Sequence, residues 1–119
     1  MRGAKQNRRW GMVGVIIVTL ATAFALTSAN PVALGVRHQV DIQRFKFTPA
    51  SLVVAPGDTV VWVNLDIVPH TITAQDDSWD SQTLQTNDAW ELRITEEMTG
   101  DYFCRFHPAM VGQVQVKLD

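Results

Sequence analysis

The chain has 119 residues, of which 46% are hydrophobic, and its formal net charge at pH 7 is −2. This length suits one ordinary domain and excludes a second catalytic module. The chain has a single cysteine, which excludes an intramolecular disulfide, so an exported form needs another use or protection for the thiol.

The first 29 residues have the pattern of an export leader. A basic start, with four Lys and Arg residues before Trp10, precedes a strongly apolar stretch at residues 11–26. Small residues follow, and A-x-A-like cleavage sites lie at residues 23–25 or 27–29. We predict that residues 1–29 form a signal peptide or an uncleaved signal-anchor helix, because about 20 apolar residues also suffice to span a bilayer.

The leader also sets the expected location and charge of the remaining chain. With the basic end in the cytoplasm, the remainder lies outside, which predicts a periplasmic or other extracytoplasmic protein, anchored to the membrane if the leader is retained. All 12 acidic residues but only six of the 10 basic ones follow Trp10, so this part has a net charge of about −6. We therefore expect a monomer that binds no nucleic acid and meets the membrane only through an uncleaved leader.

Residues 30–37 are expected to form a linker and residues 38–119 one domain of short β-strands. Val40 and Ile42 alternate with polar residues, and the apolar positions then continue in shifted phase from Phe45, which predicts a bulged or bent strand. A Pro-Gly turn precedes the next predicted strand. Strands are predicted at residues 59–65, 71–73, 89–95, 102–104 and 112–118. Short strands with turn residues between them predict an antiparallel sandwich or barrel.

The segment CRFHPAM, residues 104–110, places Cys104, His107 and Met110 at intervals of three. In an extended strand this spacing would put the first two about 10 Å apart on opposite faces. Pro108 and the strand-like flanks predict instead that the segment is a loop between neighbouring strands. A turn brings residues three apart within about 7 Å, so the three side chains can converge.

A thiolate, an imidazole and a thioether together indicate copper. Thiolate and imidazole select zinc, copper or iron, and the thioether favours cuprous copper. The blue-copper electron-transfer set needs a second histidine, for which we predict His70, just past the strand at residues 59–65. His38 is expected far from that end. Protein then fills every coordination position, which predicts an electron carrier and not an enzyme.

Three stretches of the chain resemble the cupredoxins, the small type I copper proteins of the amicyanin and plastocyanin kind. They are APGDTVVWVNLDIVPH, YFC before the CRFHPAM segment, and VGQVQV after it. The resemblance covers residues 40–118 and implies a Greek-key β-sandwich that follows the apolar N-terminal helix. It also implies one copper ion held by His70, Cys104, His107 and Met110, with His107 at the surface as the site of electron exchange.

An apolar rim is expected around His107, made of Pro69, Pro108, Ala109 and Val111. Such a rim suits a brief, weakly held encounter with a redox partner protein, either a cytochrome or a dehydrogenase. The predicted electron-transfer surface consists of His107, Pro108, Ala109 and Pro69.

Two residues depart from the family pattern. Thr71 stands where an Asn follows the first histidine, so the hydrogen bond that ties the two ligand loops is expected to be weaker or replaced. Arg105 stands where amicyanin has Thr, and its charge is expected to raise the potential or to guide an acidic partner. An acidic group is expected to form either a solvated loop or a docking patch for a basic partner: Asp76, Asp77, Asp80 and Asp88.

The sequence thus predicts a mononuclear type I copper protein that shuttles single electrons outside the cytoplasmic membrane. The alternative is a copper-binding protein for storage or delivery that uses the same pocket without redox traffic. A third interpretation is a purely structural sandwich with a chance thiol.

Overall fold

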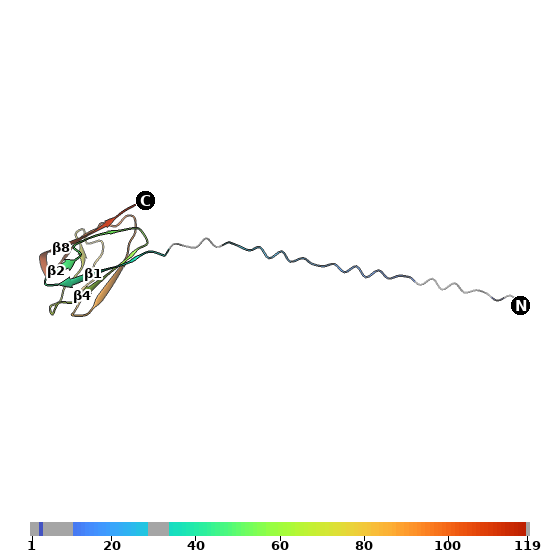
Figure 1. The fold of residues 1–119 in the computed structure, drawn as a ribbon, viewed down its shortest axis with the longest axis horizontal. Helices are drawn as coiled ribbons and strands as arrows, with labels where there is room; N and C mark the ends of the chain where they lie inside the picture. Colours follow the sequence, from blue (N-terminus) through green and yellow to red (C-terminus); the bar gives the residue numbers. More distant parts are fainter. Residues whose placement is uncertain (1–2, 4–10, 29–33, 119) are drawn as a thin grey trace. The chain divides into compact units, whose positions relative to one another are not determined.

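The structure is a computed structural model that describes residues 3, 11–28 and 34–118. The chain divides into two units, Met1–Pro31 and Val32–Asp119 (Figure 1). In the first unit, residues 11–28 have no regular secondary structure. Among the described residues, no helix is long and apolar enough to cross a membrane.

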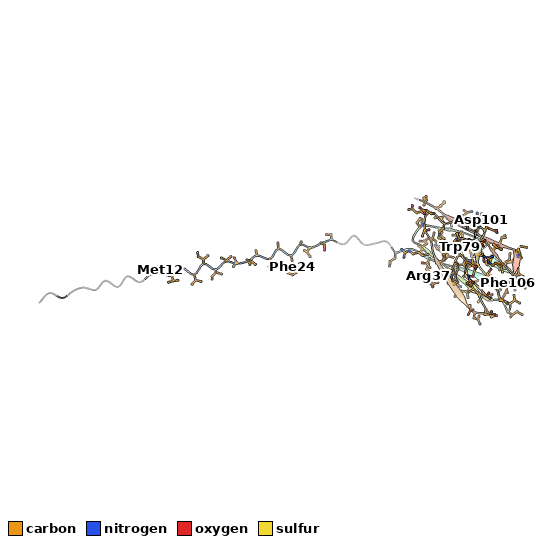
Figure 2. All side chains as sticks on the ribbon, turned by 180° about the vertical axis from the view of Figure 1, so that it is seen from behind. Met12, Phe24, Arg37, Trp79, Asp101 and Phe106 are labelled. Carbon is orange, nitrogen blue, oxygen red and sulfur yellow. The ribbon has the colours of Figure 1, made fainter. Side chains whose placement is uncertain are left out.

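The apolar helix predicted near the N-terminus is therefore absent from residues 11–28, and this part of the fold prediction is not supported. The large side chains there are exposed, as for Met12 and Phe24, labelled in Figure 2. An isolated helix gains most of its stability from burying an apolar face, and this stretch is rich in β-branched residues, which favour helix weakly. Residues 29–33, with the predicted end of the leader and half of the predicted linker, lie outside the described residues.

The second unit is a β-sandwich of two four-stranded sheets. The sheet orders are β2-β1-β4-β6 and β3-β8-β7-β5. Figure 1 labels β1, β2, β4 and β8 within this unit. The strands are β1 (Arg37–Gln43), β2 (Lys46–Thr48), β3 (Ser51–Val54), β4 (Thr59–Asn64), β5 (Thr73–Ala74), β6 (Ala89–Arg93), β7 (Asp101–Cys104) and β8 (His107–Val116).

The sheets are mixed, whereas the sequence predicted antiparallel ones. β1 pairs in parallel with β4, and β3 pairs in parallel with β8. After β2 the chain crosses to the other sheet for β3 and returns for β4, and such a crossing connection permits parallel pairing. The phase shift at Phe45 marks the two-residue turn of the β1–β2 hairpin, so the prediction of one bulged or bent strand is wrong.

Aromatic side chains join the two sheets in one core. Trp62 of β4 is fully buried, and its ring meets that of Tyr102 of β7 edge-on at 5.5 Å. Trp79 and Trp90 lie 6.2 and 5.6 Å from Trp62 and are packed against the core. This packing fixes β7, which ends at Cys104.

One histidine lies at each end of the sandwich: His38 near the start of β1, and His70 in the loop that follows β4. Arg37 of β1 pairs with Thr59 of β4, so both strands start at one end, and the loop that follows β4 lies at the other. His38 therefore lies at the end opposite His70, as predicted. In Figure 2, Arg37 and Phe106, from the β7–β8 turn, appear on different sides of the domain.

The carboxylate of Asp58 closes the end where β1 begins. It accepts hydrogen bonds from the backbone N–H groups of Ala55, at 3.0 Å, and Val36, at 2.8 Å. It also lies 2.8 Å from Nε2 of His38. The bonds from Ala55, His38 and Val36 lower the pKa of Asp58 from 3.8 to about 2, because they stabilise the ionised carboxylate.

We predict that Asp58→Asn lowers the melting temperature at neutral pH. The folded-state pKa lies below the unfolded value, so the ionised carboxylate stabilises the fold above about pH 4 and this contribution is lost as pH falls toward 2. The difference in melting temperature between the variant and the wild type should shrink over that interval, measured by circular dichroism. A difference that stays constant from pH 5 to pH 2 would contradict this role.

We predict that Gly112→Ala destabilises the domain. Gly112 of β8 lies opposite Tyr102, and a Cβ there would be 2.3 Å from a ring atom of the tyrosine. The ring of Tyr102 cannot retreat, since it is 1% exposed and packs against Phe47 and Trp62. Overpacking of this kind costs about 1–3 kcal/mol of unfolding free energy, which urea denaturation measures. Wild-type stability would refute the close packing.

Candidate metal centre

The loop between β4 and β5 places His70. Asn64, fully buried at the end of β4, donates from Nδ2 to the backbone oxygens of Val68, at 3.0 Å, and Leu84, at 2.9 Å. His70 and Leu84 also exchange two backbone hydrogen bonds, of 3.1 and 2.8 Å. The loop is thus tied at both ends, and it directs a fully buried imidazole to one fixed place.

Cys104 and His107 are brought together by a tight hairpin. β7 ends at Cys104, the turn consists of Arg105 and Phe106, and β8 begins at His107. The prediction that residues 104–110 form a loop is therefore correct only for this two-residue turn. Cys104 and His107 are register partners next to a bulge, and directly opposite residues point to the same face of a sheet.

Three of the four predicted ligands converge. The ligand atoms of His70, Cys104 and His107 all lie within 4.8 Å of one another, the one such cluster found in the described part of the chain. Sγ of Cys104 is 3.6 Å from Nδ1 of His70 and 3.7 Å from Nδ1 of His107. Donors that each bind one ion at about 2.0–2.3 Å are about 3.5 Å apart, so the three atoms fit a shared metal ion.

Met110 lies on the same strand as His107, in the hydrophobic core. Its side chain is 5% exposed and belongs to the buried cluster that contains Cys104. A buried thioether in the same cluster as the cysteine sulfur would supply the soft donor that cuprous copper prefers. The role of Met110 as a metal ligand stays a prediction.

Thr71 connects the two ligand loops by hydrogen bonds, although it stands where the family pattern has an Asn. Its backbone N–H donates to Sγ of Cys104 at 3.4 Å, and its hydroxyl oxygen accepts from the N–H of Arg105 at 2.9 Å. Hydrogen bonds to the cysteine sulfur are one means by which a protein tunes a copper potential. The tie is therefore present, with a hydroxyl in place of an amide.

The side chain of Arg105 is matched by two carboxylates. It forms ion pairs with Asp77 at 2.7 Å and with Asp80 at 3.3 Å. Asp80 also accepts from the hydroxyl of Thr73, which lies 3.0 Å from that of Thr71. A ring of hydrogen bonds thus joins the Cys104 turn to the acidic loop, and two of the four acidic residues in that loop bind Arg105.

Asp66 is a further residue of the site, which the sequence did not reveal. Its Oδ2 lies 2.8 Å from Nε2 of His70. Since Nδ1 of His70 faces Cys104, we assign the ring proton to Nε2, which donates to the carboxylate and leaves Nδ1 free for a metal. The only sequence signal for Asp66 is that it is an acidic residue four positions before a predicted ligand. Many loops contain such a residue, so this signal does not identify Asp66.

The pKa of Asp66 is below its ordinary value. Burial opposes ionisation, but hydrogen bonds from the backbone N–H groups of Phe45 and Arg44 and from the ring of His70 outweigh it. The side chain is only 12% exposed. A nearly buried negative charge therefore lies directly behind one predicted metal ligand.

Comparison with known proteins agrees with this geometry. Residues 34–117 match the family described as copper binding proteins, plastocyanin/azurin family. Amicyanin from Paracoccus denitrificans is 34% identical over 83 residues, which cover 66% of this chain and 63% of that protein. The match thus spans slightly less than two thirds of this relative.

Two solved structures resemble the domain closely. A purple cupredoxin from Nitrosopumilus maritimus has a TM-score of 0.63 and 33% identity, over 67% of this chain and 99% of that one. An oxidised amicyanin variant has a TM-score of 0.62 and 31% identity, over 68% of this chain and 82% of that one. Because the family match includes every residue of the converging cluster, the chain belongs to the plastocyanin/azurin family of copper-binding proteins.

Proposed function

We propose that this protein carries single electrons by means of one copper ion held by His70, Cys104, His107 and Met110. The observation that carries the proposal is the convergence of two imidazole nitrogens on one thiolate sulfur. With a thioether, these donors form the type I set, in which copper supplies reversible one-electron redox chemistry.

The anchoring of the donors supports electron transfer. The loop tied by Asn64 holds His70, and the β7–β8 hairpin holds Cys104 and His107. Donors fixed by backbone hydrogen bonds rearrange little between oxidation states. Four protein donors also leave no coordination position for a substrate, which supports an electron carrier rather than an enzyme.

His107 is the proposed route of the electron to the surface. It is partly exposed, whereas His70 is fully buried. Several exposed apolar residues belong to the segments around the site: Phe45, Ile67, Pro69, Phe106, Pro108, Ala109 and Val111. A surface of this composition suits brief contact with a redox partner protein, which we propose to be a cytochrome or a dehydrogenase.

We further propose an extracytoplasmic location. The support is the basic and apolar pattern of residues 1–29, followed by a domain of net negative charge. Mass spectrometry of the mature protein shows whether these residues are removed or remain as an anchor.

We predict that the purified domain binds one cupric ion per chain with an intense blue colour. The colour requires the thiolate and should vanish in Cys104→Ser, whereas Met110→Ala should keep the copper and shift its potential. Absorption spectroscopy and metal analysis check both. If the copper complex is pale and loses its metal readily, a role in copper storage or delivery is supported instead. If the domain binds no copper, only the structural role remains.

The charge of Asp66 gives the proposed site a defined electrostatic bias. The oxidised site carries one more positive charge than the reduced site. A fixed negative charge behind His70 therefore stabilises the oxidised form more and lowers the reduction potential.

We predict that Asp66→Asn raises the reduction potential by on the order of 100 mV, the size of a unit charge acting over several ångströms at an effective dielectric constant of about 20. Redox titration of the copper-loaded protein measures the shift. Asp58→Asn is the matched control, because Asp58 also binds a histidine and two backbone N–H groups, but at the opposite end of the domain. Equal shifts in the two variants would contradict a local effect.

A further inference from the structure

The β1–β2 turn is strained. Arg44 and Phe45 both have positive φ, of 54° and 57°. Two-residue hairpin turns of this kind normally consist of Asn and Gly, because a side chain in the left-handed region clashes with its own backbone. An aromatic residue there is an outlier, and such strain persists only where the surroundings impose it.

The carboxylate of Asp66 imposes this turn. Its Oδ1 accepts from the backbone N–H of Arg44 at 2.6 Å, and its Oδ2 accepts from that of Phe45 at 3.0 Å. The same Oδ2 is the atom that binds Nε2 of His70. One carboxylate therefore fixes both the strained turn and a predicted ligand.

The result of the strain is the position of one ring. Phe45 stands edge-on to His70, with centroids 5.5 Å apart, and edge-on to His107, at 4.8 Å. It also lines a groove of about 230 Å³ together with Met110. The ring is about half exposed, while His70 beneath it is fully buried, so it separates solvent from this imidazole.

We propose that Phe45 is a positioning residue of the copper centre, an aromatic lid held in a strained turn by Asp66 that keeps water from His70. The inference rests on the proposed function. Water stabilises the more charged oxidised site more than the reduced one, so a lid that excludes water raises the reduction potential. The lid also slows the approach of competing ligands.

Two variants distinguish the effect of removing the Phe45 ring from the effect of relieving the backbone strain. Phe45→Gly and Phe45→Ala both remove the ring, but only glycine adopts the positive φ without cost. In the apoprotein, Phe45→Gly should melt about 4–8 °C above Phe45→Ala, the reverse of the usual order. This measurement needs no metal.

The copper-loaded variants test the lid. Both should have a lower reduction potential than the wild type and lose copper to a chelator up to about tenfold faster, because two aromatic contacts are lost. Phe45→Leu keeps an apolar cover and should stay close to the wild type. The fall in potential is opposite in sign to the rise expected for Asp66→Asn.

Gln82→Gly is the matched control. Gln82 is exposed and also has a positive φ, of 62°, but it lies outside the ligand cluster. Its replacement should relieve the same kind of strain and leave the potential and the rate of copper loss unchanged. Comparable changes in both glycine variants would overturn the assignment to Phe45.

The outcomes distinguish this inference from the proposed function. If the wild type binds blue copper but Phe45→Gly keeps the wild-type potential and chelation rate, the lid is wrong and the copper site stands. If the glycine variant melts no higher than the alanine variant, the strained turn is refuted. If the wild type binds no copper, the proposed function fails and the lid fails with it.

Discussion

The arrangement of the site depends on one carboxylate with three hydrogen-bond donors. Asp66 accepts from two backbone N–H groups of the β1–β2 turn and lies 2.8 Å from Nε2 of His70. A nearly buried carboxylate is costly unless donors replace its water, and here each donor belongs to a part of the site. The position of Phe45, the tautomer of His70 and the local charge therefore all depend on this side chain.

The chain uses the same arrangement twice, with different consequences. At the opposite end, Asp58 also binds a histidine and two backbone N–H groups, and there it only fixes the start of β1. The difference lies in the second ring nitrogen: Nδ1 of His70 faces the sulfur of Cys104. A carboxylate–histidine pair thus contributes to metal binding only where the fold delivers a second ligand to the free nitrogen.

The sequence identifies the predicted metal ligands more readily than the residues that hold them in place. Cys104, His107 and Met110 lie within seven residues, so a local motif shows them, whereas the bonds from Asp66 to the β1–β2 turn join positions more than 20 residues apart. The shifted phase at Phe45 predicts a bulged or bent strand and not a turn, because Arg-Phe lacks the Asn-Gly signature of a tight hairpin. Alternation likewise predicts strands, but parallel pairing depends on crossings between sheets that no local pattern encodes.

Asp66 and Phe45 meet at the β1–β2 turn, and they have opposite effects on the reduction potential of the proposed copper centre. The charge of Asp66 favours the oxidised form, and the ring of Phe45, by keeping water away, favours the reduced form. The positive charge of Arg105 is offset by its ion pairs with Asp77 and Asp80. Since Asp66 also holds the turn that carries Phe45, a change at Asp66 alters both the electrostatics and the hydration of His70, whereas removal of the Phe45 ring alters its hydration.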